Sequence, residues 1–323
     1  MDTVTLDDLD RALAHALRID GRAQLRTLAE VLGVSENTVA RRYRRLRTSG
    51  VLRVVGALDG TRLGYESWHI RLRATPDAAG AIAAALARRD DASWVYLVSG
   101  GTEVVCTVHV SSSQARDDLL LHKLPRTDRV LSLSAHALMT AFATPSDWGG
   151  LSYLTPDQEW ALRPALPDPD DVPAQPRPAD RPLLDALGAD GRTSYSDLAA
   201  ATGWSVSTVR RRLDHLRAAG ILNFLLDIPP EALGLRAQTR LWMSVAPSGL
   251  VDTARTLATH PEASFVAATT GSTNLTATVN CRDTTDLYRY LTERVAPLEA
   301  IRDLETAPII RTVKRAGTLL PHL

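Results

Sequence analysis

Several residue types are scarce in this sequence, and each scarcity removes a class of protein. Only two of the 323 residues are cysteine and two are lysine. Cys106 and Cys281 lie in apolar, strand-like segments without metal-ligand spacing, so we expect reduced core thiols rather than a disulfide or a zinc site. No apolar run approaches the roughly 20 residues that cross a bilayer, and the first ten residues, MDTVTLDDLD, are unlike a secretory signal. A cytoplasmic, metal-free protein without contact to membranes is therefore predicted.

Arginine supplies nearly all of the positive charge and is concentrated in two places. Five of the seven residues from 41 to 47 are arginine, although the formal net charge of the chain is zero. A second stretch, RRRLDHLR, begins at Arg210. Residues 1 to 60 hold ten arginines against eight acidic residues. A field that attracts nucleic acid must therefore come from local placement rather than bulk charge.

The two arginine stretches belong to an internal duplication. A shift of 170 positions aligns residues 20–22 with 190–192, Asp-Gly-Arg in both, and superimposes the glycines and serines around the arginine stretches. A shift of 171 aligns SWVYLVSGGTEVVCTV with SFVAATTGSTNLTATV. The chain is therefore organised as A-B-linker-A′-B′. The predicted boundaries are 1–60, 65–144, 145–179, 180–231 and 235–318.

The linker differs from both copies in composition. Prolines recur from 164 to 178, and residues 145–180 carry seven acids against two arginines, so we expect an acidic segment without regular structure. The stretch TPDQEWAL is an exception, because Thr155 can cap a helix, Pro156 suits its first position and Gln158 completes a capping box. One short helix is predicted there.

Each A segment has the pattern of a helix-turn-helix. A short helix ends at a glycine (Gly33, Gly203), and a serine two residues later caps a second helix. One apolar stripe of that helix is predicted to be buried, which leaves its polar first turn and its arginines to meet base edges and phosphates. A strand-like run follows, as the β extension of a winged helix-turn-helix. The predicted DNA-binding residues are Ser35, Glu36, Asn37, Thr38, Arg41, Arg42, Arg44, Arg45, Ser205, Ser207, Thr208, Arg210, Arg211 and Arg212.

An arginine-rich helix is also commonly a solvated surface helix without a partner. That alternative stays open for either stretch taken alone. The glycine and serine spacing, and its occurrence twice in one chain, favour binding to double-stranded DNA.

Each B segment predicts the order strand, helix, strand, strand, helix, strand, over residues 67–142 and 237–315. This order is typical of a ferredoxin-like sandwich, in which two helices cover one face of the sheet. The other face is apolar enough to need covering, and pairing of the two B segments would cover it. The predicted fold class is α+β, with two winged helix-turn-helix domains alternating with two ferredoxin-like βαββαβ domains.

This combination resembles the Lrp/AsnC family of feast/famine transcriptional regulators, over all of the chain except the linker. The resemblance implies that the second domain, of the AsnC or RAM type, dimerises and binds a small effector, commonly an amino acid. The implied site is the loop between the second and third strands, where a glycine is usually followed by an aspartate. The glycines match, but glutamate and asparagine stand where aspartate is usual, and a tight turn that needs glycine is the alternative explanation. The implied effector residues are Gly100, Gly101, Thr102, Glu103, Thr270, Gly271, Ser272, Thr273 and Asn274.

Family members that have one copy of each domain form homodimers, which carry two DNA-binding domains. The resemblance therefore predicts that this chain is an intramolecular pseudo-dimer acting in transcription regulation, associated with the nucleoid in the cytoplasm. Further association into homo-oligomers stays open. An architectural, chromatin-like protein of the same fold is an alternative.

An enzyme is the alternative from another class. Siroheme decarboxylases have Lrp-like halves, sometimes fused, and use histidine and arginine against the tetrapyrrole. Five histidines would suggest such an enzyme, but none of them has a histidine at the matching position of the other copy. No arrangement of side chains indicates catalysis. We therefore expect neither an enzyme nor a cofactor. These histidines are His69, His109, His122, His136 and His260.

Overall fold

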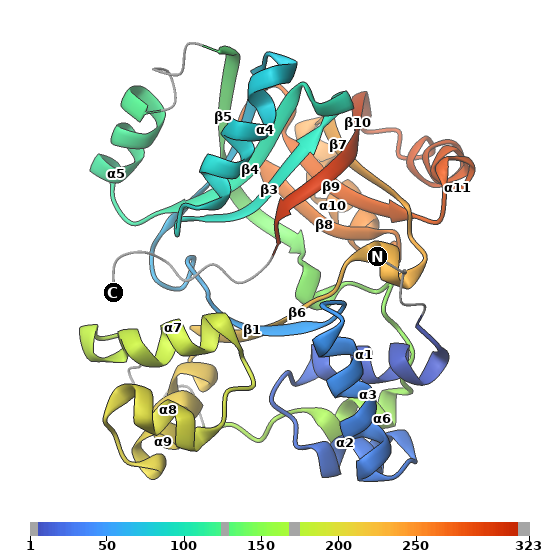
Figure 1. Cartoon of the computed structure of the whole chain (residues 1–323). Coiled ribbons are helices and arrows are strands. Elements are labelled where there is room, and N and C mark those ends of the chain that lie inside the picture. Colours follow the sequence, from blue (N-terminus) through green and yellow to red (C-terminus); the bar gives the residue numbers. More distant parts are fainter. Residues whose placement is uncertain (1–5, 124–128, 168–174, 316–323) are drawn as a thin grey trace. The chain divides into compact units, whose positions relative to one another are not determined.

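The computed structural model describes residues 6–123, 129–167 and 175–315, which divide into two compact units. The first unit contains both A segments and part of the linker, from residues 6–64, 151–167 and 175–233. The second unit contains both B segments, from residues 65–150 and 234–315 apart from 124–128. Figure 1 labels their helices and strands. Within the described ranges, none of the helices combines the length and apolar character needed to cross a bilayer.

The first unit contains two helix-turn-helix domains, which we call heads. Each head has three helices and is followed by one strand. The elements of the first head are α1 (Asp8–Ile19), α2 (Leu25–Leu32), α3 (Glu36–Thr48) and β1 (Arg53–Leu58). Those of the second head are α7 (Arg181–Ala189), α8 (Tyr195–Thr202), α9 (Val206–Ala218) and β6 (Leu222–Asp227), preceded by a 3-10 turn at Pro178–Asp180. The stripe predicted to be buried in α3 and α9 includes fully enclosed Val39, Leu46, Val209, Leu213 and Leu216. The helix-turn-helix pattern is confirmed in both heads.

The two heads share one antiparallel ribbon formed by β1 and β6. The strands were predicted as an extension of each separate head, and here they pair with each other instead. Val55 lies opposite Leu225, which is the position 170 residues later, so the equivalent residues of the two copies meet at the centre of the ribbon. The heads are therefore related by an approximate two-fold axis through this pair, as the subunits of a dimer would be.

The predicted linker helix forms and packs on the first head. Helix α6 (Pro156–Leu162) begins with the expected capping box between Thr155 and Gln158. The side-chain amide of Gln158 also donates to the carbonyl of Val31, at 2.7 Å. On α1, the buried His15 accepts hydrogen bonds at Nδ1 from the backbone N–H groups of Tyr153 and Leu154, at 3.0 and 3.1 Å. The segment before α6 is thus held by an unprotonated histidine nitrogen.

Docking of this segment should weaken as the pH falls. Burial, followed by the positive charge of Arg18, lowers the pKa of His15 from about 6.5 to about 4. The unfolded chain therefore takes up the proton first, so this stabilisation is complete above pH 6.5 and is lost between pH 6.5 and 4. We expect urea unfolding to show up to about 3 kcal/mol of pH-dependent stability in this window that is missing from His15→Gln. His122→Gln, at an exposed position, should behave as the unchanged protein, and an identical pH profile of both variants would contradict the assignment.

The second unit is a closed barrel of eight strands in the order β10-β3-β4-β2-β5-β8-β9-β7. The first B segment supplies β2 (Glu66–Ala74), β3 (Ala92–Val98), β4 (Glu103–Val110) and β5 (Val130–Ala143). The second supplies β7 (Ala237–Val245), β8 (Ala263–Thr269), β9 (Leu275–Cys281) and β10 (Ile301–Lys314). The long strands β5 and β10 each pair with a strand of both sheets, which closes the barrel. Each B segment has the predicted order of strands and helices.

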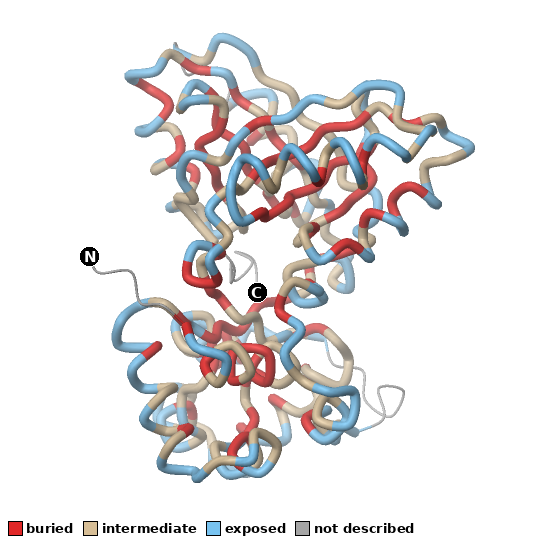
Figure 2. The backbone as a smooth tube through the Cα atoms, turned by 90° about the vertical axis from the view of Figure 1, so that its right-hand side faces the viewer, coloured by how far each residue is buried: buried red, intermediate tan, exposed pale blue. Residues whose placement is uncertain are grey.

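Two hydrophobic cores lie between the barrel and its helices. One is built on β2, β3 and β4 under α4 (Pro76–Ala87) and α5 (Ser113–Asp117), which continues as a π-helical turn to Lys123. The other lies under α10 (Leu250–Ala258) and α11 (Thr284–Arg289), which continues in the same way to Val295. Strands β3, β4, β8 and β9 are mostly buried, while β5 and β10 are mostly partly or fully exposed. Figure 2 shows buried backbone beside helices whose outer turns are exposed. Cys106 and Cys281 are free and buried, one in each core.

Candidate nucleic-acid interface

The turns that precede α3 and α9 are formed by local backbone conformation and hydrogen bonds. Gly33 and Gly203 end α2 and α8 in the left-handed conformation, with φ of 66° and 70°, which glycine adopts without steric cost. Two residues later the hydroxyl oxygens of Ser35 and Ser205 each accept a hydrogen bond from a threonine N–H three positions on, at 3.2 Å. Both serines are confirmed as helix caps, so their side chains stabilise the turn.

The first turns of α3 and α9 are accessible, together with some of the arginines beyond them. Among the predicted DNA-binding residues, the exposed ones are Ser35, Glu36, Asn37, Arg41, Arg44, Arg45, Ser205, Ser207, Arg210 and Arg211, and Thr38 and Thr208 are partly exposed. The exposed residues form one surface on each helix, and no described acidic side chain makes an ion pair with Arg41, Arg44, Arg210 or Arg211. These four arginines are available to phosphates.

Arg42 and Arg212, in contrast, are held inside their own heads. Arg212 is 11% exposed and forms an ion pair with Asp180 at 2.6 Å, and Asp180 is 1% exposed. At the equivalent place in the first head, Arg42 pairs with the buried Asp10 at 2.9 Å and with Asp7. Each arginine thus ties the third helix of its head, α3 or α9, to the start of the first helix. Arg45 also pairs with Asp10, while about half of its side chain stays exposed.

The two heads are joined by arginines that cross between them in a reciprocal manner. The guanidinium of Arg22 donates to the carbonyls of Gly191 and Thr193, at 2.6 and 3.0 Å. That of Arg192 donates to the carbonyls of Gly21 and Ala23, at 2.7 and 2.9 Å. The repeated Asp-Gly-Arg sequence thus forms a two-sided clasp between the heads. Burial lowers the pKa of both arginines, but not far enough for either to lose its charge near neutral pH.

A second reciprocal pair of contacts joins the C-terminal ends of α3 and α9 to the clasp. Arg47, at the end of α3, pairs with Asp190 at 2.5 Å, and Arg217, at the end of α9, pairs with Asp20 at 2.7 Å. Arg217 and Asp20 are both largely buried. Sequence reasoning missed these contacts, although the matching Asp-Gly-Arg sequences were visible in the repeat. The contacts join the C-terminal end of each of these helices to the opposite head.

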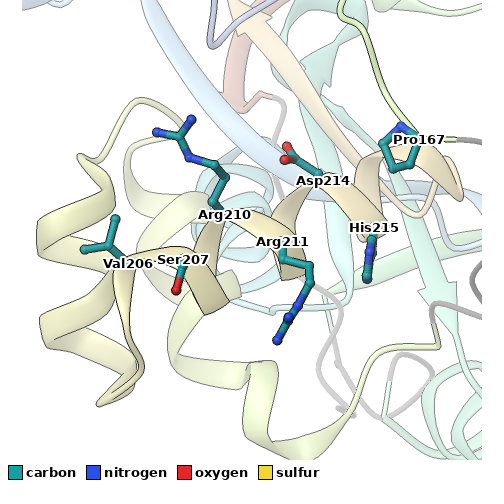
Figure 3. A pocket seen from close by; sticks show the side chains of 7 residues that line it. All are labelled: Pro167, Val206, Ser207, Arg210, Arg211, Asp214 and His215. Atoms are coloured by element: carbon teal, nitrogen blue, oxygen red, sulfur yellow. The ribbon is translucent and has the colours of Figure 1, made fainter.

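The second head differs from the first around α9. Arg210 lies over the ring of Tyr195, with 4.7 Å from its guanidinium carbon to the ring centroid, and the first head has leucine and alanine at the equivalent positions. An open hollow of about 680 Å³ lies beside α9 and is lined by Pro167, Val206, Ser207, Arg210, Arg211, Asp214 and His215. In Figure 3, Arg210 and Arg211 extend from this helix in different directions. The two surfaces are therefore chemically distinct.

The loops predicted to bind an effector are engaged in contacts within the barrel. Gly100, Gly101 and Gly271 have positive φ of 70°, 86° and 105°, as the tight-turn explanation requires. The buried Glu103 accepts two hydrogen bonds from Arg71, at 2.6 and 3.1 Å, and Thr102 donates to the backbone of its own loop.

The corresponding loop of the second copy is also held by its surroundings. The side chain of Asn274 pairs with both backbone groups of Val245, at 2.8 and 2.9 Å. The hydroxyl of Thr270 accepts from the N–H of Ala137, and the carbonyl of Thr273 accepts from Thr269. These contacts account for the polar groups that replace the usual aspartate. Effector binding at these loops, including Ser272, stays a prediction.

Family models match both kinds of unit. An AsnC-type helix-turn-helix domain matches residues 6–47 and 179–217, and an Lrp/AsnC ligand binding domain matches residues 241–319. An uncharacterised helix-turn-helix transcriptional regulator of Pyrococcus abyssi is 31% identical over 139 residues, which cover 43% of this chain and 87% of the relative. The chain belongs to the Lrp/AsnC family.

One further relative and one solved structure extend the comparison. The regulatory protein AsnC of Escherichia coli is 29% identical over 146 residues, which cover 42% of this chain and 93% of AsnC. The crystal structure of the siroheme decarboxylase NirDL matches 96% of this chain and 93% of its own, with a TM-score of 0.63 and 14% sequence identity. At that identity the match shows a common fold, in which two Lrp/AsnC-type halves lie in one chain.

Removal of Asp180 should destabilise the second head strongly. Asp180→Ala leaves Arg212 largely buried without its counter-charge, and we expect a loss of about 3 kcal/mol in the free energy of unfolding. The matched control is Asp185→Ala, which removes a partly exposed pair with Arg181 and should cost about 0.5 kcal/mol. Urea unfolding followed by circular dichroism measures both. Equal losses for the two variants would show that the buried pair does not anchor α9.

Proposed function

We propose that this chain is a sequence-specific DNA-binding transcription regulator whose two heads act together as an intramolecular pseudo-dimer. The observation that carries the proposal is the pairing of both heads in one unit by β1, β6 and the arginine clasp, while the polar first turns of α3 and α9 stay exposed. Two-fold related helices of this kind meet successive major grooves on one side of a duplex.

The exposed arginines supply affinity, and the first turns supply selectivity. Arg41, Arg44 and Arg211 bear charges free to meet phosphates, which attract any duplex. Asn37 and Ser207 stand at equivalent positions of the two helices but differ in hydrogen-bonding capacity. The two half-sites are therefore expected to differ in sequence.

We propose further that the chain acts by binding rather than by catalysis, with an amino acid or a similar small molecule as effector. The match to the Lrp/AsnC ligand binding domain supports the effector. Membership of a family with AsnC and other regulators supports binding rather than catalysis. A tetrapyrrole absorption band in the visible spectrum of the purified protein would contradict this part of the proposal.

Loss of one exposed arginine in either head should weaken DNA binding. Arg41→Ala and Arg211→Ala are each expected to lower duplex affinity up to about tenfold, because each removes a phosphate contact. The slope of log affinity against log salt concentration should fall by about 1 for each variant. Fluorescence anisotropy over a salt series measures both. Arg255→Ala, at an exposed position on α10, is the matched control.

Unchanged affinity in both head variants would contradict the DNA interface. The ratio of affinities for a selected operator and for random duplex, measured at one salt concentration, distinguishes a regulator from an architectural protein. A ratio near 1 would favour the architectural function.

A single chain should protect two half-sites. Footprinting is expected to show two protected regions roughly 34 Å apart, which is about one helical turn. Their sequences should form an imperfect palindrome, because α3 presents Glu36 and Ala40 where α9 presents Val206 and Arg210. Protection of one region alone, by a complex shown to contain one chain, would contradict the pseudo-dimer.

A further inference from the structure

Two pairs of equivalent residues from the two copies meet inside the barrel. On β2 and β7, Ile70 and Leu241 belong to the outer cores beneath the helices, and the alternating neighbours face inward. The guanidinium carbon of Arg71 lies 4.1 Å from the ring centroid of Trp242. Nη2 of Arg240 lies 3.1 Å from Nε2 of His69. In both pairs the partners are 171 positions apart, the register of the B segments.

The charge of Arg71 is balanced. It forms ion pairs with Glu103, at 2.6 Å, and with Glu305. The second of these carboxylates is about half exposed, so water screens the excess negative charge of the cluster.

The charge of Arg240 is not balanced in this way. Its side chain donates to the hydroxyls of Thr278 and Thr276, at 2.6 and 3.0 Å, and the ring centroid of Phe265 lies 5.5 Å from its guanidinium carbon. Across the described ranges, no aspartate or glutamate forms an ion pair with Arg240. The residue is 3% exposed, and its Nε has no hydrogen-bond partner. A buried guanidinium without a counter-charge is strongly unfavourable.

The neighbouring histidine adds a second unpartnered donor. Arginine can only donate, so Nε2 of His69 accepts from Arg240 and the neutral ring carries its proton at Nδ1. That Nδ1 has no hydrogen-bond partner, and His69 is 2% exposed. Burial lowers the pKa of His69 well below its usual value, and the charges of Arg240, His136 and Arg71 lower it further. The histidine therefore stays neutral and donates from Nδ1.

We propose that the barrel interior binds a small monovalent anion at the Arg240–His69 pair, and that a carboxylate is the chemical group it takes. The guanidinium of Arg240 supplies one fixed positive charge and an unused Nε–H donor, and His69 holds this guanidinium through the hydrogen bond to Nη2. Guanidinium pairs most favourably with planar carboxylates, through charge-assisted hydrogen bonds. Enclosure of both residues restricts the ligand to a small one. This site is separate from the effector loops and independent of DNA binding.

Calorimetry and thermal unfolding of the full chain test the proposal. The protein is dialysed into sodium gluconate, whose large anion keeps the ionic strength constant, and titrated with sodium formate. We expect one formate per chain and a rise of a few degrees in the unfolding midpoint. Arg240→Met should show neither effect, while its midpoint in gluconate should equal or exceed that of the unchanged protein. Arg255→Met, which removes an exposed arginine of the same unit, should respond to formate as the unchanged protein does.

Each contrary result overturns a stated part of the proposal. The site is absent if formate neither binds nor raises the midpoint, or if it stabilises Arg240→Met equally. Should Arg240→Met fail to fold, His69→Phe is the second variant, because it keeps a ring but removes the Nε2 acceptor that positions the guanidinium. It should bind formate several-fold more weakly, and unchanged binding would overturn the role of His69. Chloride is expected to bind about tenfold more weakly than formate, and equal binding would overturn the carboxylate assignment.

Discussion

The antiparallel pairing of β1 with β6 is the interaction on which the arrangement of the two heads depends. Two isolated strands are marginally stable in water, so this ribbon needs support from its surroundings. The crossing arginines provide it, because Arg22 and Arg192 satisfy four backbone carbonyls of the opposite copy. Gly21 and Gly191 permit the close approach, since a Cβ at either position would meet Phe224 or Val54 within about 3 Å. The ribbon and the clasp therefore form one structure.

The same chemistry divides the arginines of α3 and α9 into two groups. Those next to the acidic residues of their own head or of the opposite head stabilise the fold, as Arg42, Arg212 and Arg217 do. Those on the outer side, such as Arg41 and Arg211, have no such partner and stay exposed. The number of arginines in the stretch therefore overstates the charge that is available to a duplex. Local geometry, rather than composition, decides which side chains are available.

The features that were predicted correctly from the sequence depend on residues that are close together in the chain. The caps at Ser35 and Ser205 and the capping box at Thr155 follow from side chains that reach backbone groups three positions away. The order of strands and helices in the B segments follows from their hydrophobic periodicity. Both kinds of signal lie within one short stretch of chain, and the duplication allowed each to be checked against its copy.

The features that were not predicted from the sequence are contacts between residues that are distant in the chain. Arg212 was assigned to DNA because nothing in its own stretch indicates Asp180, which lies in the turn before α7 and meets Arg212 only in the folded head. The pairing of β1 with β6 depends in the same way on assembly of the heads. The inner face of the barrel was expected to be apolar, and it is so around Val98, Val105 and Ala307. Alternation along single strands did not reveal that the same face also encloses polar side chains.

The contact between His69 and Arg240 has a consequence for how such a protein can evolve. In a homodimer, a side chain on the symmetry axis faces its own copy, so an arginine there would face an identical cation. Gene fusion removes that restriction, because each copy then mutates separately. A cation and a neutral imidazole can thus stand face to face on the axis, an asymmetric pair that identical subunits cannot encode.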